Sequence, residues 1–531
     1  MASSSLVRKS AVVALIALLS AFAPTARAAA LTITTPATQT AVSGNQFSLQ
    51  IVASGGTGGN QFTLASGSLP AGLALETNTG LISGTPTTSV SASIAIRVTD
   101  NSSASATTSS FLINTGWIVS TFAGNGNQTT SGDGGPATSA GMLPHALSIR
   151  SDGTVYFSDI SAGSLRRVDS NGNVQNISTP GSSITGLVVR DNGDLLYNIY
   201  SGTNPIKKFT ASNSVTSNYS ASSPTFSMPR GLNSDQAGNL YLADAGNHVI
   251  RKIAADGSMT TVAGNGSAAT SGDGAAATSA AINYPGDVAI GSDGSLYITE
   301  LNGNTLRKVS PSGVITTLVA NGSYAGENVA FANARTPGVW GVAVDGGNNV
   351  FVMEKNGIAL RRIDAITGQI TRVAGTGSSG TNGSPVNGIS SIATFSSLVM
   401  VMRFDRQGNL YLIDYSNNMI RRIAGIGTPF TTPVATAALS VGSGWRKGVS
   451  QNISVTLSTE GRVTFFANGK RIPGCINKMA SGTAPITVTC AWKPTTSGSL
   501  FVSAILTPTD NTLSQASARV NVAVARRSAF R

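Results

Sequence analysis

One heptapeptide of this chain reads Gly238-Asn239-Leu240-Tyr241-Leu242-Ala243-Asp244. A Gly turn precedes an alternating segment, which predicts a β-strand. Close copies stand at 294–300 and 408–414, and weaker copies stand at 153–159, 193–199 and 348–354. Six such units, each with room for about four short strands, predict an all-β fold built around a β-propeller.

A basic pair follows every copy, at 166–167, 207–208, 251–252, 307–308, 361–362 and 421–422. The repeat is therefore 41 residues long at its shortest (166 to 207) and 60 at its longest (361 to 421). In five copies an acid stands seven residues before the first base: Asp159/Arg166, Asp244/Arg251, Glu300/Arg307, Glu354/Arg361 and Asp414/Arg421. The second copy has Ile199 where the acid should be, so it is the least regular.

These acid–base pairs have two interpretations, a ring of binding charges or a pairing across each hairpin. Repetition in almost every copy favours the pairing, because packing devices recur while binding sites are local. If such a pair is exposed, it is worth a few tenths to about 1 kcal/mol.

The repeats resemble the bacterial members of the NHL family. The phrases that carry the resemblance are Ala263-Gly264-Asn265-Gly266, Ser271-Gly272-Asp273-Gly274 and Ala277-Thr278-Ser279-Ala280, with a second set at 123–126, 131–134 and 137–140. The resemblance implies a six-bladed β-propeller, whose relatives mostly bind proteins, glycans or nucleic acid. A minority of related propellers are lyases or lactonases with a metal in the central channel. The two Ser-Gly-Asp-Gly runs each offer one carboxylate, so we interpret them as turns between blades and not as calcium or phosphate loops.

Two strand-rich modules flank the repeats. The segments 69–73 (Leu-Pro-Ala-Gly-Leu) and 79–86 (Thr-Gly-Leu-Ile-Ser-Gly-Thr-Pro) resemble the putative-Ig (cadherin-like) domains of bacterial surface proteins, which implies a β-sandwich at 29–115. That module holds only Glu76 and Asp100 as carboxylates, too few for the oxygen shell that calcium prefers. The run 461–470 looks like part of a bacterial Ig-like repeat domain, with Asn468-Gly469 as its hairpin turn, and predicts a second sandwich at 433–525.

Targeting and redox signals place the chain outside the cytoplasm. A basic start and a 12-residue apolar run (11–22) precede Ala26-Arg27-Ala28, so we expect a signal peptide at 1–28 cleaved after Ala28; an uncleaved anchor is the alternative. No later stretch is apolar enough to predict a transmembrane segment. The only cysteines, Cys475 and Cys490, are expected to form a disulfide on adjacent or facing strands. A secreted or periplasmic protein is therefore predicted.

Charge is sparse and uneven. Only 11% of the residues are charged, and the net charge is +12. Residues 427–531 hold 11 basic and 2 acidic side chains, including a basic tail at 526–531, so the excess belongs to the C-terminal module. This module is a candidate for contact with anionic envelope polymers, or simply a solvated basic surface. No basic groove with interleaved aromatics indicates nucleic-acid binding.

The chain holds two histidines, His145 and His248, which are too few for a His-based metal site. His248 is expected in an exposed hairpin turn. No cofactor is therefore predicted, although calcium or another divalent metal held by Asp, Glu or Asn stays open.

Alignment of the copies on their Gly turns predicts where a ligand binds. Six positions at the start of the inner strands come into register: His145, Thr185, Arg230, Gly286, Trp340 and Met400. Unlike the packing positions these do not repeat, and Asp287 stands beside one of them. We expect His145, Arg230, Asp287 and Trp340 to form the principal contact surface at one mouth of the channel. Drift at an unconstrained mouth would also give a mixed ring.

The propeller, expected at 116–428, lacks an outer strand after its sixth basic pair, where Gly425-Ile426-Gly427-Thr428-Pro429 follows. We expect residues 118–122 to supply that strand by pairing with 419–423, which would close the ring. The favoured function is an exported, non-enzymatic scaffold whose propeller contacts an extracellular or envelope protein or glycan, with the Ig-like modules as spacers or anchors. A propeller hydrolase or lyase with a channel metal, and a structural surface protein, are the alternatives.

Overall fold

In the computed structural model the described residues are those of 29–525 without 182, 201–205, 213, 220–224, 236, 255, 323–328, 331–334, 356–358, 377–387, 397, 431–436, 442–444, 458–460, 469, 482–485 and 509–515. The expected signal peptide (1–28) and basic tail (526–531), and one residue of the expected Asn468-Gly469 turn, lie outside this part of the chain. Among the described residues the fold is all-β, and no helix is long and apolar enough to cross a membrane.

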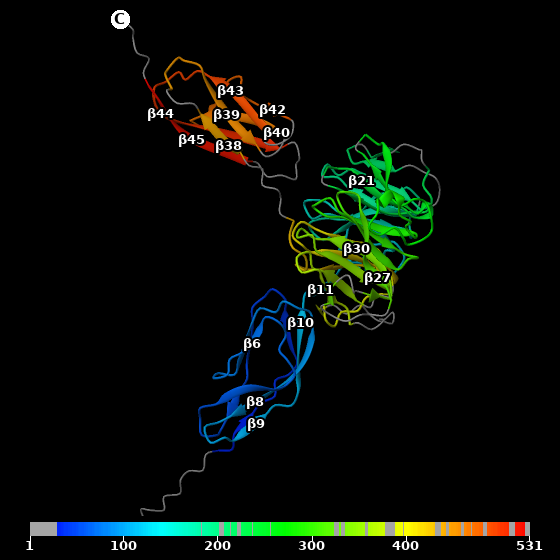
Figure 1. Ribbon diagram of the computed structural model, residues 1–531, viewed down its shortest axis with the longest axis vertical. Helices are drawn as coiled ribbons and strands as arrows, with labels where there is room; N and C mark the ends of the chain where they lie inside the picture. The colour runs from blue at the N-terminus through cyan, green and yellow to red at the C-terminus, as the bar shows by residue number, and fades with distance from the viewer. Residues whose placement is uncertain are drawn as a thin grey trace, which may run out of the picture.

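The middle of the chain forms six sheets, each with at least four strands (Figure 1). We name them blades one to six. Blade one holds β12 (Pro144–Ile149), β13 (Val155–Asp159), β14 (Ser164–Val168) and β15 (Val174–Ser178). Blade two holds β16 (Ile184–Val189), β17 (Leu195–Ile199), β18 (Lys207–Thr210) and β19 (Val215–Asn218). Blade three holds β20 (Pro229–Ser234), β21 (Leu240–Asp244), β22 (Val249–Ile253) and β23 (Met259–Ala263).

The other three blades carry additional short strands. Blade four holds β24 (Pro285–Ile290), β25 (Leu296–Glu300), β26 (Thr305–Val309), β27 (Ile315–Asn321) and β29 (Arg335–Thr336). Blade five holds β30 (Val339–Val344), β31 (Val350–Glu354), β32 (Leu360–Ile363), β33 (Gln369–Ala374) and β28 (Val329–Ala330). Blade six holds β35 (Met402–Phe404), β36 (Leu410–Asp414), β37 (Met419–Ile423), β11 (Ile118–Ala123) and β34 (Gly388–Ile389).

The first strands of successive blades contact one another in a closed cycle, β12, β16, β20, β24, β30, β35 and back to β12. These six are the inner strands, and they surround a central channel. The prediction of a propeller is therefore confirmed, and the cycle contains six blades.

The heptapeptide strand is buried on both of its faces. All five residues of β21 are buried, and so are those of the matching strands β13, β25, β31 and β36. The two faces of β21 pack against two different neighbours: Leu242 joins the apolar cluster shared with blade two, and Ala243 the cluster shared with blade four. Both faces of the strand are buried because each blade lies between two others.

The acid–base pairs lie across neighbouring strands, as expected. Their N–O distances are 3.1 Å for Asp159–Arg166, 3.1 Å for Asp244–Arg251, 3.3 Å for Glu300–Arg307, 2.7 Å for Glu354–Arg361 and 3.4 Å for Asp414–Arg421. Blade two has a different pair, Lys208–Asp194, at 2.9 Å. Most of these side chains are fully buried, so removal of one partner would leave an uncompensated buried charge and cost more than the loss of an exposed pair.

The Ser-Gly-Asp-Gly turns belong to the same device. Asp133, in the first of them, accepts a hydrogen bond at 2.9 Å from Arg166 of blade one. Asp273, in the second, pairs at 2.6 Å with Arg307 of blade four. These carboxylates therefore fasten the turns that precede the two blades, which agrees with a structural role.

The ring closes as predicted. Strand β11 pairs antiparallel with β37, with Val119 opposite Ile423 and Ser120 opposite Arg422. A segment that precedes the first blade thus supplies an outer strand to the last one. On its other side β11 pairs with β34, so it is flanked by strands on both sides.

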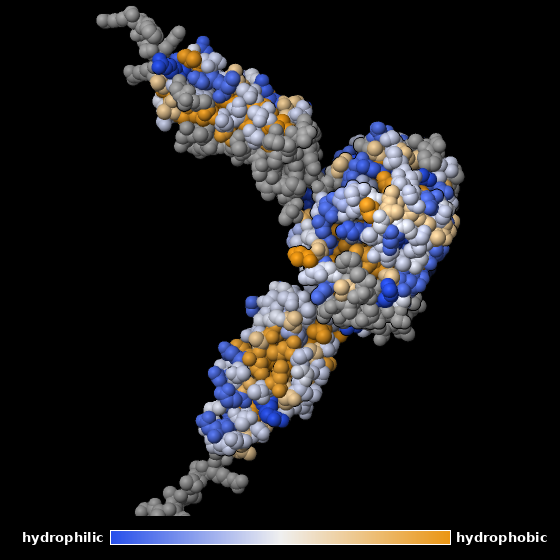
Figure 2. All heavy atoms as spheres, in the orientation of Figure 1, coloured by the Kyte–Doolittle hydropathy of each residue, from blue (hydrophilic) through white to orange (hydrophobic). Residues whose placement is uncertain are grey.

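The N-terminal module forms three small sheets around one apolar cluster. Its strands are β1 (Thr32–Ile33), β2 (Gln39–Val42), β3 (Phe47–Gln50), β4 (Ala53–Ser54), β5 (Gln61–Ser66), β6 (Leu73–Leu75), β7 (Leu81–Gly84), β8 (Ser91–Thr99), β9 (Ser105–Thr107) and β10 (Phe111–Gly116). Apolar side chains gather on the face of this module that Figure 2 shows. At its junction with the propeller, the hydroxyls of Ser89 and Ser390 lie 2.9 Å apart.

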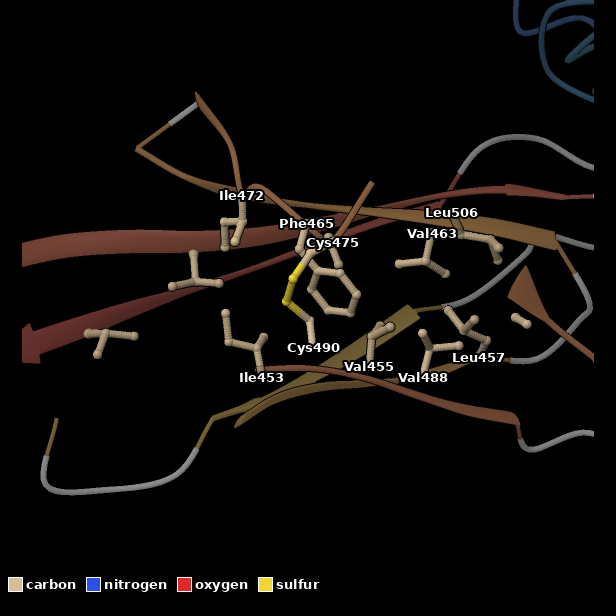
Figure 3. Close-up of a cluster of buried hydrophobic side chains, with 14 of the residues drawn as sticks. Ile453, Val455, Leu457, Val463, Phe465, Ile472, Cys475, Val488, Cys490 and Leu506 are labelled. Atoms are coloured by element: carbon tan, nitrogen blue, oxygen red, sulfur yellow. A yellow bond between two sulfur atoms is a disulfide. The ribbon is translucent and has the colours of Figure 1, made fainter. Parts of the chain in front are cut away.

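The C-terminal module is a two-sheet sandwich. One sheet holds β38 (Ala437–Val441), β39 (Gln451–Leu457) and β43 (Ile486–Trp492), and the other holds β40 (Gly461–Ala467), β41 (Lys470–Arg471), β42 (Lys478–Ala480), β44 (Gly498–Pro508) and β45 (Ala516–Val524). Cys475 and Cys490 are bonded across its core, with a Cα–Cα distance of 5.7 Å (Figure 3). The disulfide is confirmed, but Cys475 lies in the turn before β42 and not on a strand.

Candidate functional site

The aligned positions lie at one end of the channel. His145, Thr185, Arg230, Gly286 and Trp340 are each the second residue of an inner strand, and Met400 stands just before β35. Because the inner strands run in the same direction around the ring, these residues surround one mouth, which we call the first mouth.

Arg230 lies between two tyrosines at this mouth. Its guanidinium carbon is 5.4 Å from the ring centre of Tyr200 and 5.2 Å from that of Tyr284. The two phenol oxygens are 3.5 Å apart. The hydrogen bond to Tyr284 and partial burial raise the pKa of Tyr200; the pKa of Tyr284 is lowered because this hydrogen bond and Arg230 outweigh the opposing effect of its burial. Blades two, three and four therefore meet in one cation–aromatic cluster.

His145 extends this cluster toward blade six. Its ring meets that of Tyr415 edge-on, with centres 5.8 Å apart. Burial, with a smaller contribution from the positive charge of Arg230, lowers the pKa of His145 to about 4. The imidazole is therefore neutral at physiological pH.

Trp340 stands on blade five with a cation of its own. The Nζ atom of Lys355 lies 5.3 Å from the centre of the indole. Lys355 also donates a hydrogen bond of 2.9 Å to the carbonyl of Leu301 on blade four, and a second one to Asn304. The indole therefore lies beside a cation that a bridge between blades four and five holds in place.

Asp287 does not share this mouth surface. It is 1% exposed, and its carboxylate forms an ion pair of 2.9 Å with Arg403 of blade six. Arg403 also donates to the carbonyl of Leu232 on blade three, so its side chain crosses the channel. Burial raises the pKa of Asp287 although Arg403 opposes the shift. Asp287 was expected to belong to the contact surface, but its side chain is buried in an ion pair with the arginine that crosses the channel.

The other aligned positions serve packing. The hydroxyl of Thr185 is buried and donates a hydrogen bond of 2.7 Å to the carbonyl of Pro229. Gly286 faces Leu301 so closely that a Cβ would lie 2.6 Å from its side chain. Met400 packs against the apolar cluster between blades six and one.

The alignment of the copies did not identify three tyrosines and one lysine that lie at the first mouth. Tyr200, Lys355 and Tyr415 each follow directly after the acid position of their copy, where Ile160, Ala245 and Leu301 stand in the others. That column does not repeat, which is the same signal that identified the inner-strand positions. Tyr284 precedes β24, and its backbone N–H donates to His248, so His248 supports the mouth and is not simply an exposed turn residue.

The side chains that could hold a metal ion lie apart or are already engaged. In the part of the chain that the structure describes, no three His, Cys, Asp or Glu side chains gather to hold a metal ion. Asp287 is occupied by Arg403. In the N-terminal module Asp100 already accepts hydrogen bonds from the backbone of Thr57, Ser102 and Ala104, which lower its pKa to about 2.

Comparisons with known proteins agree with the fold. The family model described as "Putative Ig domain" matches residues 29–116, and the "Teneurin NHL domain" model matches residues 266–441. No curated protein sequence matches the chain.

Solved structures similar to the chain include a protein of unknown function from Bacteroides thetaiotaomicron VPI-5482, with 16% identity and a TM-score of 0.47 over 75% of this chain and 98% of that one. An auxiliary nutrient binding protein from the same organism has 13% identity and a TM-score of 0.47, also over 75% and 98%. A streptogramin B lyase structure has 17% identity and a TM-score of 0.39 over 57% of this chain and 96% of that one. Likenesses of this level carry no argument. The two family models match an Ig-type segment at 29–116 and an NHL-type segment at 266–441 of this chain.

Proposed function

We propose that this chain is an exported, non-enzymatic binding scaffold whose NHL-type propeller binds an extracellular or envelope macromolecule, a protein or a glycan, at the first mouth. His145, Arg230 and Trp340 make the contacts, together with Tyr200 and Tyr284. The Ig-like modules at its two ends act as spacers or anchors.

Two unsatisfied buried nitrogens carry this proposal. Within the described residues, His145 Nδ1 and Arg230 Nε are buried and have no hydrogen-bond partner. A buried polar atom without a partner costs about 1–3 kcal/mol, so it calls for an explanation. The two side chains are close enough for the charge of Arg230 to lower the pKa of His145. Because both atoms are enclosed, a ligand with hydrogen-bonding groups would satisfy them by displacing the side chains that cover them.

The surrounding side chains are those that dominate binding energies. Trp, Tyr and Arg are enriched among residues whose loss costs an interface 2 kcal/mol or more. Tyr200, Tyr284, Trp340 and Tyr415 are all half-buried, so each presents part of its ring while the fold holds the rest. Little conformational entropy is lost when such preorganised groups meet a ligand.

Location and charge complete the proposal. A secreted or periplasmic protein meets polysaccharides and surface proteins, and the disulfide is consistent with an oxidising compartment. The basic C-terminal module would add non-specific attraction to anionic envelope polymers.

A binding screen with matched variants tests the function. The full chain is applied to a glycan array, and immobilised full chain is used to capture proteins from an envelope fraction. For any ligand found, the Arg230→Ala/Trp340→Ala double variant should bind roughly 30-fold more weakly, because each truncation should cost about 1 kcal/mol. Lys308→Ala, which removes another cation placed over a tyrosine ring, is the control and should bind normally. Unchanged affinity in the double variant would refute the first mouth as the site.

A further inference from the structure

The channel has a second mouth, formed where the inner strands end. A pocket of about 480 Å³ opens there, within the range of small-molecule sites. It is lined by the ends of the inner strands and by the hairpin turns that follow them, for example Ser234, Ile290 and Val344. This pocket lies at the opposite end of the channel from His145, Arg230 and Trp340, so it is independent of the function proposed above.

Arg403 separates this pocket from the first mouth. It lines the pocket, and its guanidinium reaches the carbonyl of Leu232 at 3.2 Å and the carboxylate of Asp287 at 2.9 Å. Blades three and four are thereby connected to blade six through the channel. The pocket therefore ends on a fixed floor whose positive charge is neutralised by Asp287.

The charges around the pocket are largely engaged, and carboxylates outnumber arginines once the partners Asp287 and Asp152 are counted. Three arginines and three aspartates line it: Arg150, Arg403, Arg406, Asp191, Asp235 and Asp405. Asp405 accepts hydrogen bonds from the backbone of Gln407 and from both nitrogens of Asn409, and Asp235 binds Asn239 in the same way. Arg150 is paired with Asp152. An anionic ligand would therefore find no excess of positive charge here.

Two phenylalanines line the pocket, and the ring of one of them, Phe404, also packs edge-on against Phe351 with ring centres 4.9 Å apart. Phe404 lies on β35, and Phe430 comes from the segment that leaves blade six. That segment is held in place because Phe430 N–H donates to the carbonyl of Arg406 at 3.0 Å, and Thr428 N–H donates to Asp345 at 2.8 Å. The hydroxyls of Ser151, Ser234 and Ser292 supply neutral polar groups nearby.

The geometry points to a second binding site at this pocket, for a small neutral polyhydroxylated ligand, a mono- or disaccharide. Such a ligand has apolar ring faces that can lie against Phe404 or Phe430, and hydroxyls that hydrogen-bond to serine, asparagine and carboxylate groups. It needs no countercharge, and the carboxylates around the pocket do not repel it as they would repel an anion.

Saccharide titration of the full chain tests this site. The probes are glucose, galactose, mannose, maltose and cellobiose, with glucuronate and galacturonate as their charged counterparts, measured by saturation-transfer NMR and calorimetry. At least one neutral sugar should bind with a Kd of about 1 mM or tighter, and the uronates should bind at least tenfold more weakly. Ser292→Trp, which places an indole at the pocket, should reduce binding at least tenfold. Ser312→Trp, an exposed substitution in another turn of the same blade, should not.

Phe430→Ala, outside the blades, provides a second variant whose effect does not depend on the fold of blade four; it should also weaken binding. Absence of neutral-sugar binding, stronger binding of the uronates, or full binding by both pocket variants would overturn the inference. The first-mouth screen has a different readout, so either proposal can fail while the other stands.

Discussion

Arg166 offers the sharpest test of what holds a blade together. Its side chain is 0% exposed, and its nitrogens donate to Asp133, Asp159, the carbonyl of Gly141 and the carbonyl of Ser131 at 2.8–3.1 Å. Arg166→Met keeps much of the apolar volume but removes every one of these donors. The carboxylate of Asp159 would remain buried with three weaker partners, of which Leu143 N–H and Thr130 are the nearest.

The magnitude follows from the burial. Removal of one partner from a buried ion pair costs about 3–5 kcal/mol, whereas an exposed pair costs 1 kcal/mol or less. At about 2–4 °C per kcal/mol for a large domain, the propeller transition in calorimetry should fall by roughly 6–20 °C. Arg167→Met is the control: this neighbouring arginine is half-buried and its guanidinium donates to the neutral side chain of Gln175, so the expected loss is within about 1 kcal/mol.

A further variant separates lost attraction from an uncompensated charge. Asp159→Leu combined with Arg166→Met should recover part of the lost stability, because an apolar pair of similar volume often replaces a buried ion pair at little cost. If Arg166→Met were no more damaging than Arg167→Met, the blades would not depend on these pairs and the reasoning would be wrong.

Three other changes have defined outcomes. Proline at both Ser120 and Thr121 should prevent β11 from pairing with β37. In denaturant titrations the free energy of unfolding of the propeller should then fall by at least about 3 kcal/mol, whereas alanine at both positions should lower it by less. Because the unfolded-state pKa of His145 is about 6.5 and its folded-state pKa about 4, the unfolded chain binds the extra proton between these values. Stability should fall by up to about 3 kcal/mol as the pH drops through this window, and His145→Gln should flatten that part of the unfolding profile; an unchanged slope would contradict the assignment. Reduction of the disulfide, or serine at both Cys475 and Cys490, should cost the C-terminal module about 2–4 kcal/mol and leave the propeller transition in place.

Much of the architecture could be predicted because it repeats. The heptapeptide and its basic pair identify each blade, and the missing outer strand after residue 424 predicts the role of 118–122, since a ring must close. The depth of burial could not be predicted in this way. The pattern of one strand does not show that blades cover both of its faces, so it does not show that loss of one member of the Asp159–Arg166 pair leaves a buried charge.

The site was predicted only in part, for a similar reason. His145, Arg230 and Trp340 lie at one mouth because their register on the inner strands is local information. Asp287 has the same register to within one residue, yet it turns inward, since its partner Arg403 comes from 116 positions further along the chain. No local pattern encodes that contact. Two tyrosines of the mouth, Tyr200 and Tyr415, stand at the aligned position directly after that of the acid. They can be identified from the sequence only when the aligned positions that do not repeat are compared with one another.

The closure of the ring by β11 also determines when the protein can fold. Thr121 and its neighbour Met419 are separated by 298 residues, so at about 5–20 residues per second a ribosome needs roughly 15–60 s to make the second after the first. During that interval the earliest propeller strand lacks β37 and presents an open edge on that side. Five blades can assemble beside it without completing the circle. A chain that stalls before residue 419 would therefore be a candidate for aggregation, and a chaperone that covers residues 118–123 would act at the most vulnerable point of the nascent protein.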